Sequence, residues 1–561
     1  MSCVLLSTER TLDGARRLLI AAAIGLVVLV LGLGCGSSGS PAGNDDDDDE
    51  PPALGTIYID ASNAGFEDGT EAHPYNTIWE GMDVATRGDT LIVAAGSYGG
   101  RQDEEIDVPV VVKVLGAGFD ETVVDAYFVV SAPEDSVAVL FKHMAFDGVA
   151  FSWGNRPGAR RVTDWHRTPS TASRGAIDDL LSPRVEYAPV HIDSCDAGFA
   201  AVSYPPDHTY IVENSLVDSL VFDHAATLTR ATRTIRDCLV AGNISFTHGG
   251  GDARTTIENC AIGGAIWMRN GSGATFTITE NTVHGIIDKS GANFTTISHN
   301  MLPTGDVIDT SGGWGQESQF IEHNDIQNGI IENRSGCATV RYNTVNAPAD
   351  TYAIQMNCGA PANLVGNTVT LPGAGEPTGD PGDWRNVGIL AICGEGVITG
   401  NEVTGGSIGI WDVSGATELS ENVVSASHWG IVAGYGNGKA FTDNTVSNCV
   451  SDGVRFLATG LGSHYGAFED NFITNNGGAG VRLFCDVDMG GGAQGAWGGN
   501  VLTGNAGYDL YIEVPSDSAA VIYAERNTWD HGSEGGIDSL DIYDANDDPS
   551  LADVDMMPLA N

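Results

Sequence analysis

Short runs of alternating apolar and polar residues fill the chain from about residue 55 onward. The segments 276–283 (Phe-Thr-Ile-Thr-Glu-Asn-Thr-Val) and 453–457 (Gly-Val-Arg-Phe-Leu) are typical. Alternation of period two, in β-branched and aromatic residues, predicts β-strands with one buried face. The runs are too short for helices, and glycine is abundant, with 74 residues in 561. The pattern therefore predicts an all-β protein built from many short strands.

An asparagine recurs on one register through the C-terminal two-thirds of the chain, about every 24 residues. Such a period predicts a β-solenoid of about 16 coils, in which each repeat contacts only its neighbours. Stacked coils place equivalent positions about 4.8 Å apart, so a repeated Asn can hydrogen-bond along its own column. We place Asp237 on this register between Asn214 and Asn259, and Ser194 and His143 upstream. The recurring residues are Asn214, Asn259, Asn281, Asn300, Asn324, Asn343, Asn367, Asn401, Asn422, Asn444, Asn471, Asn500 and Asn527.

The two ends of the repeat region have their own patterns. Ile78, Met82 and Ala85 have helical spacing, so residues 77–86 are predicted to form a short amphipathic helix that covers the first coil. Residues 55–555 resemble the right-handed parallel β-helix superfamily, which includes pectate lyases and many bacterial surface proteins. The resemblance rests on the four-residue motifs around each recurring Asn, on the two ends and on the strand starts. The motifs that carry the resemblance are 57–60 (Ile-Tyr-Ile-Asp), 73–78 (His-Pro-Tyr-Asn-Thr-Ile), 88–93 (Gly-Asp-Thr-Leu-Ile-Val), the Gly-Ile or Gly-Val pairs at Gly409, Gly430, Gly453 and Gly480, and 542–551 (Ile-Tyr-Asp-Ala-Asn-Asp-Asp-Pro-Ser-Leu).

The resemblance implies the fold and leaves the activity open. We expect a single-stranded right-handed parallel β-helix over residues 101–561, with residues 55–100 as an N-terminal capping segment. A long loop is inserted at about residues 153–189, where the register is interrupted.

The first 34 residues look like a bacterial lipoprotein signal peptide. Arg16 and Arg17 precede an apolar run, 18–33, which ends in a small residue before Cys35. This order of basic, apolar and small residues is typical of a secretion signal, and Cys35 is the predicted lipidation site. Gly32 departs from the usual lipobox, which has Leu or a similar residue three places before the Cys. A transmembrane anchor is the alternative, although the apolar run is shorter than the roughly 20 residues that a span requires.

Residues 35–54 are predicted to tether the body of the protein to the membrane. They contain Gly, Ser and Pro, followed by the acidic run Asp45–Glu50, and have too few apolar residues to form a core. Gly36 follows Cys35, so no Asp stands where lipoprotein sorting reads a retention signal. By analogy with lipoproteins, we expect an exported, lipid-anchored protein at the outer membrane or cell surface, with no other contact to the membrane.

The charge balance restricts the partners. The formal net charge is −48, with 26 Lys and Arg against 74 Asp and Glu. Such a surface repels nucleic acid and anionic lipid, so neither is expected as a partner. Ca²⁺ is the candidate cofactor, because a divalent cation suits such a negatively charged surface. No other cofactor or metal site is predicted. Plain solubility is the alternative reason for the acidity.

Two pairs of cysteines fall on neighbouring coils. Cys238 and Cys260 each follow a register residue, and Cys358 and Cys393 occupy matching strand ends. Adjacent coils bring Cα atoms within the distance that a disulfide tolerates, and an exported protein permits oxidation. Disulfides Cys238–Cys260 and Cys358–Cys393 are therefore predicted, with pairs of buried thiols as the alternative.

The inserted loop concentrates arginine in an acidic protein. Arg156, Arg160, Arg161 and Trp165 lie within it. Guanidinium groups bind carboxylates through paired hydrogen bonds, and a flat aromatic ring suits a pyranose face. These four residues are predicted to bind an anionic sugar, and a solvated loop whose arginines pair with acidic neighbours is the alternative.

Polar residues end several consecutive predicted strands close to this loop. We predict Lys289, Asp288, Asp309 and His248 as catalytic residues and Arg269 as a substrate-binding residue. β-Elimination on a uronate needs a cation at the carboxylate and a base for the C5 proton, whereas hydrolysis needs two carboxylates. A slip of one residue exchanges the inner and outer faces, so the sequence leaves open whether Asp288 or Lys289 faces outward. Ordinary polar strand ends are the alternative.

The sequence thus predicts a surface protein that binds an extracellular, anionic polysaccharide. If it is an enzyme, it is expected to be a polysaccharide lyase or a glycoside hydrolase. The motifs of polygalacturonases and pectate lyases are missing, which favours the alternative of a non-catalytic scaffold or adhesin-like protein. Trp411, Trp429, Arg455 and Arg482 are further outward positions that could contact sugars.

Overall fold

The computed structural model describes most of the chain between residues 55 and 560. Residues 1–54, which include the predicted signal peptide, Cys35 and the tether, lie outside this part. The remaining gaps are 100–104, 109–111, 119, 131–138, 152–189, 198–199, 204–208, 224–230, 248–252, 270–273, 291–293, 306, 312–318, 335–336, 358–361, 379–383, 393–395, 414–417, 435–439, 458–463, 518–520 and 561.

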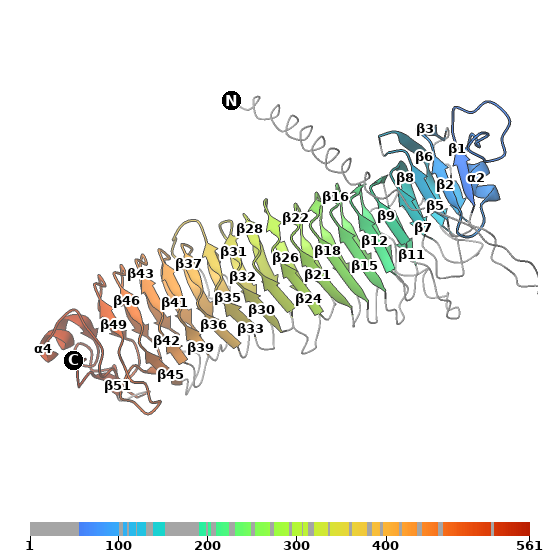
Figure 1. Cartoon of the computed structure of the whole chain (residues 1–561). Coiled ribbons are helices and arrows are strands. Elements are labelled where there is room, and N and C mark those ends of the chain that lie inside the picture. The colour runs from blue at the N-terminus through green and yellow to red at the C-terminus, as the bar shows by residue number, and fades with distance from the viewer. Residues whose placement is uncertain are drawn as a thin grey trace, which may run out of the picture. The chain divides into compact units, whose positions relative to one another are not determined.

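The described residues form a parallel β-solenoid whose coils stack along one axis (Figure 1). Each complete coil supplies a strand to each of three sheets, which we call sheet 1, sheet 2 and sheet 3 in chain order. Every strand pairs in parallel with its counterpart one coil away, as β12, β15, β18 and β21 do in sheet 1. The predicted parallel β-helix is confirmed. The coil count differs from the predicted 16, because sheet 1 contains 18 strands.

Sheet 1 runs the length of the solenoid. Its strands are β1 (Thr56–Ile59), β2 (Thr90–Val93), β5 (Lys113–Gly116), β7 (Val139–Lys142), β9 (Val190–Asp193), β12 (Thr209–Glu213), β15 (Thr232–Arg236), β18 (Arg254–Glu258), β21 (Thr275–Thr279), β24 (Phe294–Ser298), β27 (Gln319–Glu322), β30 (Ala338–Arg341), β33 (Ala362–Val365), β36 (Gly396–Thr399), β39 (Glu418–Ser420), β42 (Ala440–Thr442), β45 (His464–Glu469) and β48 (Asp486–Asp488).

Sheet 2 consists of short strands that follow the corner after sheet 1. They are β3 (Gly96–Tyr98), the first halves of β6 (Thr122–Val130) and β8 (Ala145–Phe151), β10 (Asp196–Ala197), β13 (Leu216–Val217), β16 (Leu239–Val240), β19 (Ala261–Ile262), β22 (Thr282–Val283), β25 (Met301–Leu302), β28 (Asp325–Gln327), β31 (Thr344–Asn346), β34 (Thr368–Thr370), β37 (Glu402–Thr404), β40 (Val423–Ser425), β43 (Thr445–Ser447), β46 (Phe472–Thr474) and β49 (Val501–Thr503).

Sheet 3 closes each coil and carries the candidate site. Its strands are β4 (Glu105–Val108), the second halves of β6 and β8, β11 (Ala200–Ser203), β14 (Leu220–Asp223), β17 (Ile244–Thr247), β20 (Ile266–Arg269), β23 (Ile287–Ser290), β26 (Val307–Ser311), β29 (Ile330–Asn333), β32 (Tyr352–Met356), β35 (Val387–Ala391), β38 (Ile408–Asp412), β41 (Trp429–Ala433), β44 (Val454–Phe456), β47 (Val481–Leu483), β50 (Leu510–Ile512) and β52 (Ile542–Tyr543).

A column of buried asparagines holds the corner between sheets 1 and 2. The Asn300 Oδ1 accepts hydrogen bonds from the backbone N–H and the Nδ2 of Asn281, at 3.1 and 3.0 Å. The Asn281 Nδ2 also donates to the carbonyl oxygens of Ile257 and Thr279. The side-chain bond repeats from coil to coil as far as Asn527. The predicted ladder therefore exists and satisfies backbone groups that the turn would leave unpaired.

The first coils correct the predicted register by one residue. Asn214, Asp237 and Asn259 do not belong to the ladder: each precedes it and has a left-handed backbone, with φ between 50° and 53°. The same shift applies upstream to His143 and Ser194, whose φ values are 57° and 55°. Asn and Asp tolerate this conformation better than most residues, so two adjacent positions of the turn both favour them.

The ladder positions of these early coils hold Cys195, Ser215, Cys238 and Cys260. The Cys260 backbone N–H donates to the Asn281 Oδ1 at 2.9 Å, which joins the early coils to the asparagine column. The Cys238 Sγ lies 3.1 Å from the Arg236 carbonyl oxygen, the bond that an Asn Nδ2 makes elsewhere. Cysteine and serine thus make part of the bonding of the ladder.

A short helix covers the first coil, as predicted. Helix α2 (Ile78–Val84) begins after Thr77, whose side chain accepts from the Glu80 backbone N–H, while the Glu80 carboxylate accepts from the Thr77 backbone N–H. This reciprocal capping box satisfies two amide groups at the helix start. Ile78 and Met82 are buried against the first strands. Among the described residues, no helix has both the length and the apolar character needed to cross a membrane.

The C-terminal coil ends in irregular elements. The 3-residue α4 (Glu534–Gly536) and the π-helical η2 (Ile537–Asp541) lead into β52, and β51 (Val521–Tyr523) pairs with β53 (Asp553–Asp555). Ile537, Ile542 and Val554 join the core there, which extends without a break from the N-terminal strands.

Replacing Asn281 with Leu should lower stability by about 1–3 kcal/mol, because the Cys260 N–H and the Ile257 carbonyl lose their buried partner. Urea unfolding and hydrogen exchange of the neighbouring coils measure this loss. The control is Asn346→Leu, at a half-buried position where the amide bonds only to Gln327. It should change stability by less than about 0.5 kcal/mol. Equal losses in both variants would contradict the role given to the ladder.

Candidate functional site

The outward side chains of sheet 3 form a column that follows the solenoid axis. Parallel pairing in register places each of these residues beside its counterpart one coil away. We call this column the sheet 3 row. In chain order it consists of Ser245, Trp267, Asp288, Asp309, Glu332, Gln355, Leu390, Trp411, Val432, Arg455, Arg482, Tyr511 and Tyr543.

The first part of the row is acidic. Asp288, Asp309 and Glu332 occupy three successive strands, β23, β26 and β29, directly after Trp267. Arg334 follows β29 and lies 2.7 Å from the Glu332 carboxylate and 3.8 Å from the Asp309 Oδ2. The strand spacing sets the backbones of neighbouring carboxylates about 4.8 Å apart.

Asp309 is the unusual member of this group. Its side chain is only 19% exposed, and its Oδ1 has no hydrogen-bond partner. Burial raises the pKa of the Asp309 carboxyl to about 6, Arg334 opposes the shift, and the charges of Glu332 and Asp288 add to it. A carboxyl that holds its proton close to neutral pH can act as a general acid.

The geometry resolves the open choice between Asp288 and Lys289. Asp288 is partly exposed on the row, whereas Lys289 is fully buried and faces the core between Met268 and Thr310. A buried ammonium cannot reach a ligand on the outer surface, so the catalytic role predicted for Lys289 is not supported. The alternation of β23 is the physical reason, because Ile287 must also face inward.

The other predicted site residues fall at or beyond the edge of the described residues. The Arg269 backbone lies in β20 beside Ser290, but its side chain is not described. His248, Arg156, Arg160, Arg161 and Trp165 lie outside the described residues, as do Cys358 and Cys393. Their roles stay predictions. Glu332 and Arg334 were missed, although Glu332 holds the strand position of Asp309 one coil later.

Cys238 and Cys260 are neighbouring buried residues and are free thiols in the structure. A hydrogen bond between the two thiols and burial raise the pKa of Cys238 well above its ordinary value. Their location on adjacent coils agrees with the predicted proximity, and the disulfide between them stays a prediction.

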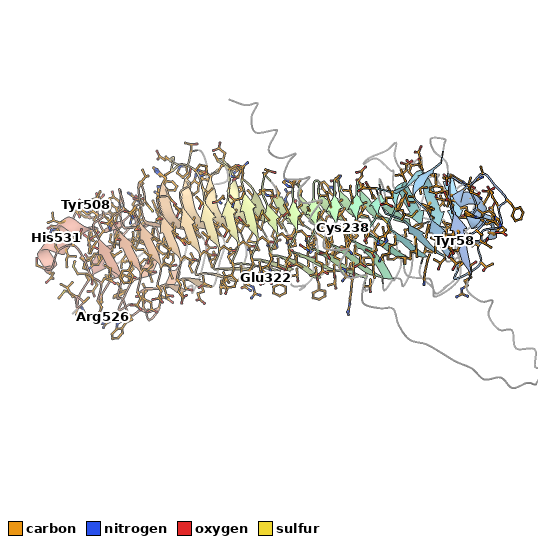
Figure 2. The ribbon with its side chains drawn as sticks, turned by 45° about the horizontal axis from the view of Figure 1, so that its top comes forward. Tyr58, Cys238, Glu322, Tyr508, Arg526 and His531 are labelled. Carbon is orange, nitrogen blue, oxygen red and sulfur yellow. The ribbon has the colours of Figure 1, made fainter. Side chains whose placement is uncertain are left out.

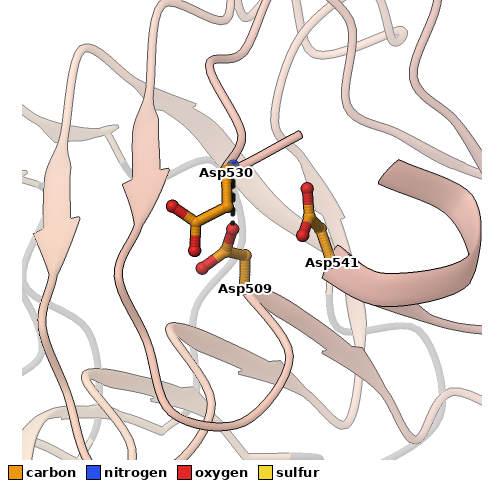
Figure 3. Close-up of side chains that lie close together, drawn as sticks. All are labelled: Asp509, Asp530 and Asp541. Carbon is orange, nitrogen blue, oxygen red and sulfur yellow. Dashed lines mark hydrogen bonds between the residues drawn. The ribbon is translucent and has the colours of Figure 1, made fainter. Parts of the chain in front are cut away.

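A second group of carboxylates lies at the C-terminal end. Among the described residues, Asp509, Asp530 and Asp541 bring one oxygen each within 4.8 Å of the others (Figure 3). The protein itself supplies donors to all three: the Asn505 Nδ2 to Asp509 at 2.7 Å, the Gly504 N–H to Asp530 and the His531 N–H to Asp541. Burial raises the pKa of Asp509 to about 7, so this carboxyl carries a proton through part of the neutral range. These bonds account for the cluster as part of the terminal turn.

Comparisons with known proteins give one family match and weak structural likenesses. A profile of the family described as "Protein of unknown function (DUF1565)" matches residues 362–534, which is less than half of the chain. No curated protein matches the sequence.

Two solved structures are similar over most of their length. One is the PL6 family polysaccharide lyase Pedsa3628 from Pseudopedobacter saltans, with 12% identity, a TM-score of 0.18, and coverage of 85% of this chain and 89% of that one. The other is the mannuronan C-5 epimerase AlgE6 A-module from Azotobacter vinelandii, with 10% identity, a TM-score of 0.17, and coverage of 86% and 93%. Values this low carry no inference about activity.

The raised pKa of Asp309 predicts a pH-dependent effect of Asp309→Asn. The folded state binds the Asp309 proton more tightly than the unfolded state, so the contribution of this group to stability is lost as pH rises through about 6. The stability of Asp309→Asn relative to the parent protein should therefore rise between about pH 4 and pH 7 and stay level above that, measured by urea unfolding. Asp325→Asn, at an exposed position of sheet 2, is the control. A difference that does not change with pH would contradict the assignment.

Proposed function

We propose that the protein binds a polysaccharide along the sheet 3 row and hydrolyses it at Asp309. The observation that carries the proposal is the sequence of side chains on successive strands: Trp267, then Asp288, Asp309 and Glu332. An aromatic ring beside carboxylates suits a sugar, because the ring packs on the pyranose face and the carboxylates reach its hydroxyls and glycosidic oxygen.

The acid–base assignment follows from the surroundings of each carboxyl. Asp309 keeps its proton to about pH 6 and donates it to the glycosidic oxygen as the bond to the leaving sugar breaks. Asp288 is assigned as the second carboxylate because it is the register partner of Asp309 on the adjacent strand, whereas Glu332 lies 2.7 Å from Arg334. Side chains on adjacent coils fit the roughly 5 Å spacing at which the second carboxylate attacks the anomeric carbon, and water then releases the sugar from the ester with retention.

Hydrolysis is favoured over β-elimination by the position of Lys289. A lyase needs a base at the outer surface for the C5 proton; Lys289, predicted for that role, is buried, and His248, also predicted, lies outside the described residues. Among the described side chains that face outward in the acidic part of the row, Arg334 is the only cation available to stabilise a uronate carboxylate, and it lies against Glu332.

A non-catalytic scaffold is the second candidate, and one observation favours it. Trp384, Trp411 and Trp429 form a cluster on the outer face of sheet 3, where each is 6–8% exposed. Most of the aromatic area in this part of the row is therefore covered by the protein itself. These rings stabilise the surface of the solenoid and do not offer their faces to a ligand.

Asp309→Asn should reduce release of reducing ends from the substrate polysaccharide at least about a hundredfold, because the general acid is lost. The parent kcat/KM should fall above about pH 6, as Asp309 loses its proton. The assay uses a panel of neutral and acidic polysaccharides with and without Ca²⁺, and Asp325→Asn serves as the matched control. Binding without products in any arm would overturn the hydrolase assignment. Absence of both binding and products would leave the scaffold.

We further propose that the protein is exported and anchored to the outer membrane or cell surface through Cys35. The order of Arg16, Arg17, the apolar run 18–33 and Cys35 supports this. A fatty-acid analogue fed to producing cells should label the parent protein, and Cys35→Ser should abolish the label because the acceptor thiol is lost. Label on Cys35→Ser, or a mature chain that keeps residues before Cys35, would favour a transmembrane anchor.

A further inference from the structure

The sheet 3 row changes character in its C-terminal part, where two arginines follow apolar residues. Arg455 in β44 and Arg482 in β47 are register partners, and Arg482 is followed by Tyr511 in β50. The two arginines share an anchor, the buried carboxylate of Asp452, but their remaining contacts differ. This difference identifies one of them as a binding group.

Arg482 has its donors occupied by the protein. Its Nε lies 2.8 Å from the Asp452 Oδ2 and its Nη1 lies 2.7 Å from the Glu513 Oε1. The guanidinium also stacks over the Tyr511 ring, 4.3 Å from its centroid. Arg482 is therefore a structural link between three coils.

Arg455 also stacks on an aromatic ring, but it keeps donors unused. Its guanidinium lies over the Trp429 ring, 4.1 Å from the centroid, with the Phe484 ring at 5.5 Å. Its only ionic contact within the described residues joins Nε to the Asp452 Oδ2 at 3.3 Å, and that contact does not satisfy Nε as a hydrogen bond. The two Nη atoms of Arg455 have no hydrogen bond or ion pair with any described residue.

The donors that the protein leaves unused on Arg455 are available to a ligand. The Arg455 side chain is 17% exposed and its Nε is buried, and burial lowers the pKa of the guanidinium from the ordinary arginine value. Carboxylates are abundant in this protein, whose net charge is −48, yet the nearest one, Asp452, is shared with Arg482. The arrangement leaves a rigid guanidinium edge open to a ligand.

We propose that Arg455 binds the carboxylate of an acidic sugar, so that the polysaccharide on the sheet 3 row contains uronic acid units. The two Nη atoms match the two oxygens of a planar carboxylate. This inference rests on the proposed function and names its substrate class. It places recognition of the acid on β44 and not in the inserted loop, where the sequence predicted it.

Beyond Arg482, the row continues as tyrosines that pack on one another. Tyr511 and Tyr543 are stacked, with centroids 4.5 Å apart and an interplanar angle of 12°, and Tyr508 packs at their edge. Five strand steps separate Glu332 from Arg455 along the row. At about 4.8 Å a step this is roughly 24 Å, a length that several sugar units span.

The test measures binding of uronate oligosaccharides to the full purified chain by calorimetry. The probes are galacturonate, glucuronate and mannuronate oligomers, their carboxyl-reduced neutral counterparts and a sulfated oligosaccharide. Arg455→Gln should weaken binding of the bound uronate at least about tenfold and leave the carboxyl-reduced counterpart unaffected, because only the carboxylate contact is lost. Arg455→Lys keeps the charge and the stem but loses the paired geometry, so it should also weaken binding.

Arg526→Gln is the matched control. Arg526 also stacks over an aromatic ring, 4.6 Å from the Trp497 centroid, but it lies at the corner between sheets 1 and 2. Figure 2 shows Arg526 and Tyr508 on opposite sides of the C-terminal coils. Its replacement should leave affinity unchanged. Thermal unfolding checks each variant, and Arg455→Lys keeps the test decisive if Arg455→Gln fails to fold.

Each contrary result identifies what has failed. Glycan binding that Arg455→Gln and Arg455→Lys leave unchanged would overturn this inference and leave the proposed polysaccharide binding intact. An equal loss in Arg526→Gln would mean that overall charge, and not the Arg455 site, governs affinity. Preference for the sulfated probe, lost in Arg455→Gln, would overturn the uronate assignment. Absence of binding to every probe would overturn the proposed function together with this inference.

Discussion

The head-to-tail hydrogen bonds of the asparagine column hold the coils of this solenoid in register with one another. The corner between sheets 1 and 2 turns sharply inside the protein and would leave backbone N–H and carbonyl groups without water. Asn281 meets that need with one amide, which bonds to its own coil and to both neighbours, and the later Asn residues repeat the bonds to the neighbouring coils. Because the bond has one length at every step, the coils stack in strict register. The strands of sheet 3 belong to the same coils, so the residues of the sheet 3 row are aligned as well.

The fold was predictable because its determinants are local and repeated. Strand alternation, the 24-residue period and the helix at Ile78 are all readable without knowing any long-range contact. The register of the first coils was not, since the left-handed position and the ladder position are adjacent and both accept Asn. Asn259 and Asn281 look equivalent in the sequence, yet one has a φ of 51° and the other is a buried ladder residue. Cys238 and Cys260 gave no signal of belonging to the ladder, because a thiol is an unusual substitute for an amide.

The candidate site was predicted in part. Asp288 and Asp309 were named from their matching strand positions, and the structure places them on neighbouring strands of sheet 3. The neighbouring Lys289 could not be excluded from sequence, because period-two alternation fixes the face only after one residue of the strand has been assigned. The raised pKa of Asp309 depends on burial and on Arg334, which no local pattern reveals. The same holds for Arg455: its sequence neighbours do not show that Trp429, on the preceding coil, lies beneath it.

The asparagine column also has a direction. Every Oδ1 accepts from the coil before it, so the amides point the same way from Asn281 to Asn527. Aligned amide dipoles polarise one another, and each bond strengthens the next. Damage is consequently asymmetric: loss of one Asn orphans a backbone N–H in the preceding coil, while the following Asn loses only one of its donors. If a coil were duplicated and inserted anywhere along the column, its Asn Nδ2 would donate to the Oδ1 of the following Asn. Its Oδ1 would accept from the Nδ2 of the preceding Asn. Solenoid length can therefore change by whole coils during evolution while the order of side chains on each face is preserved.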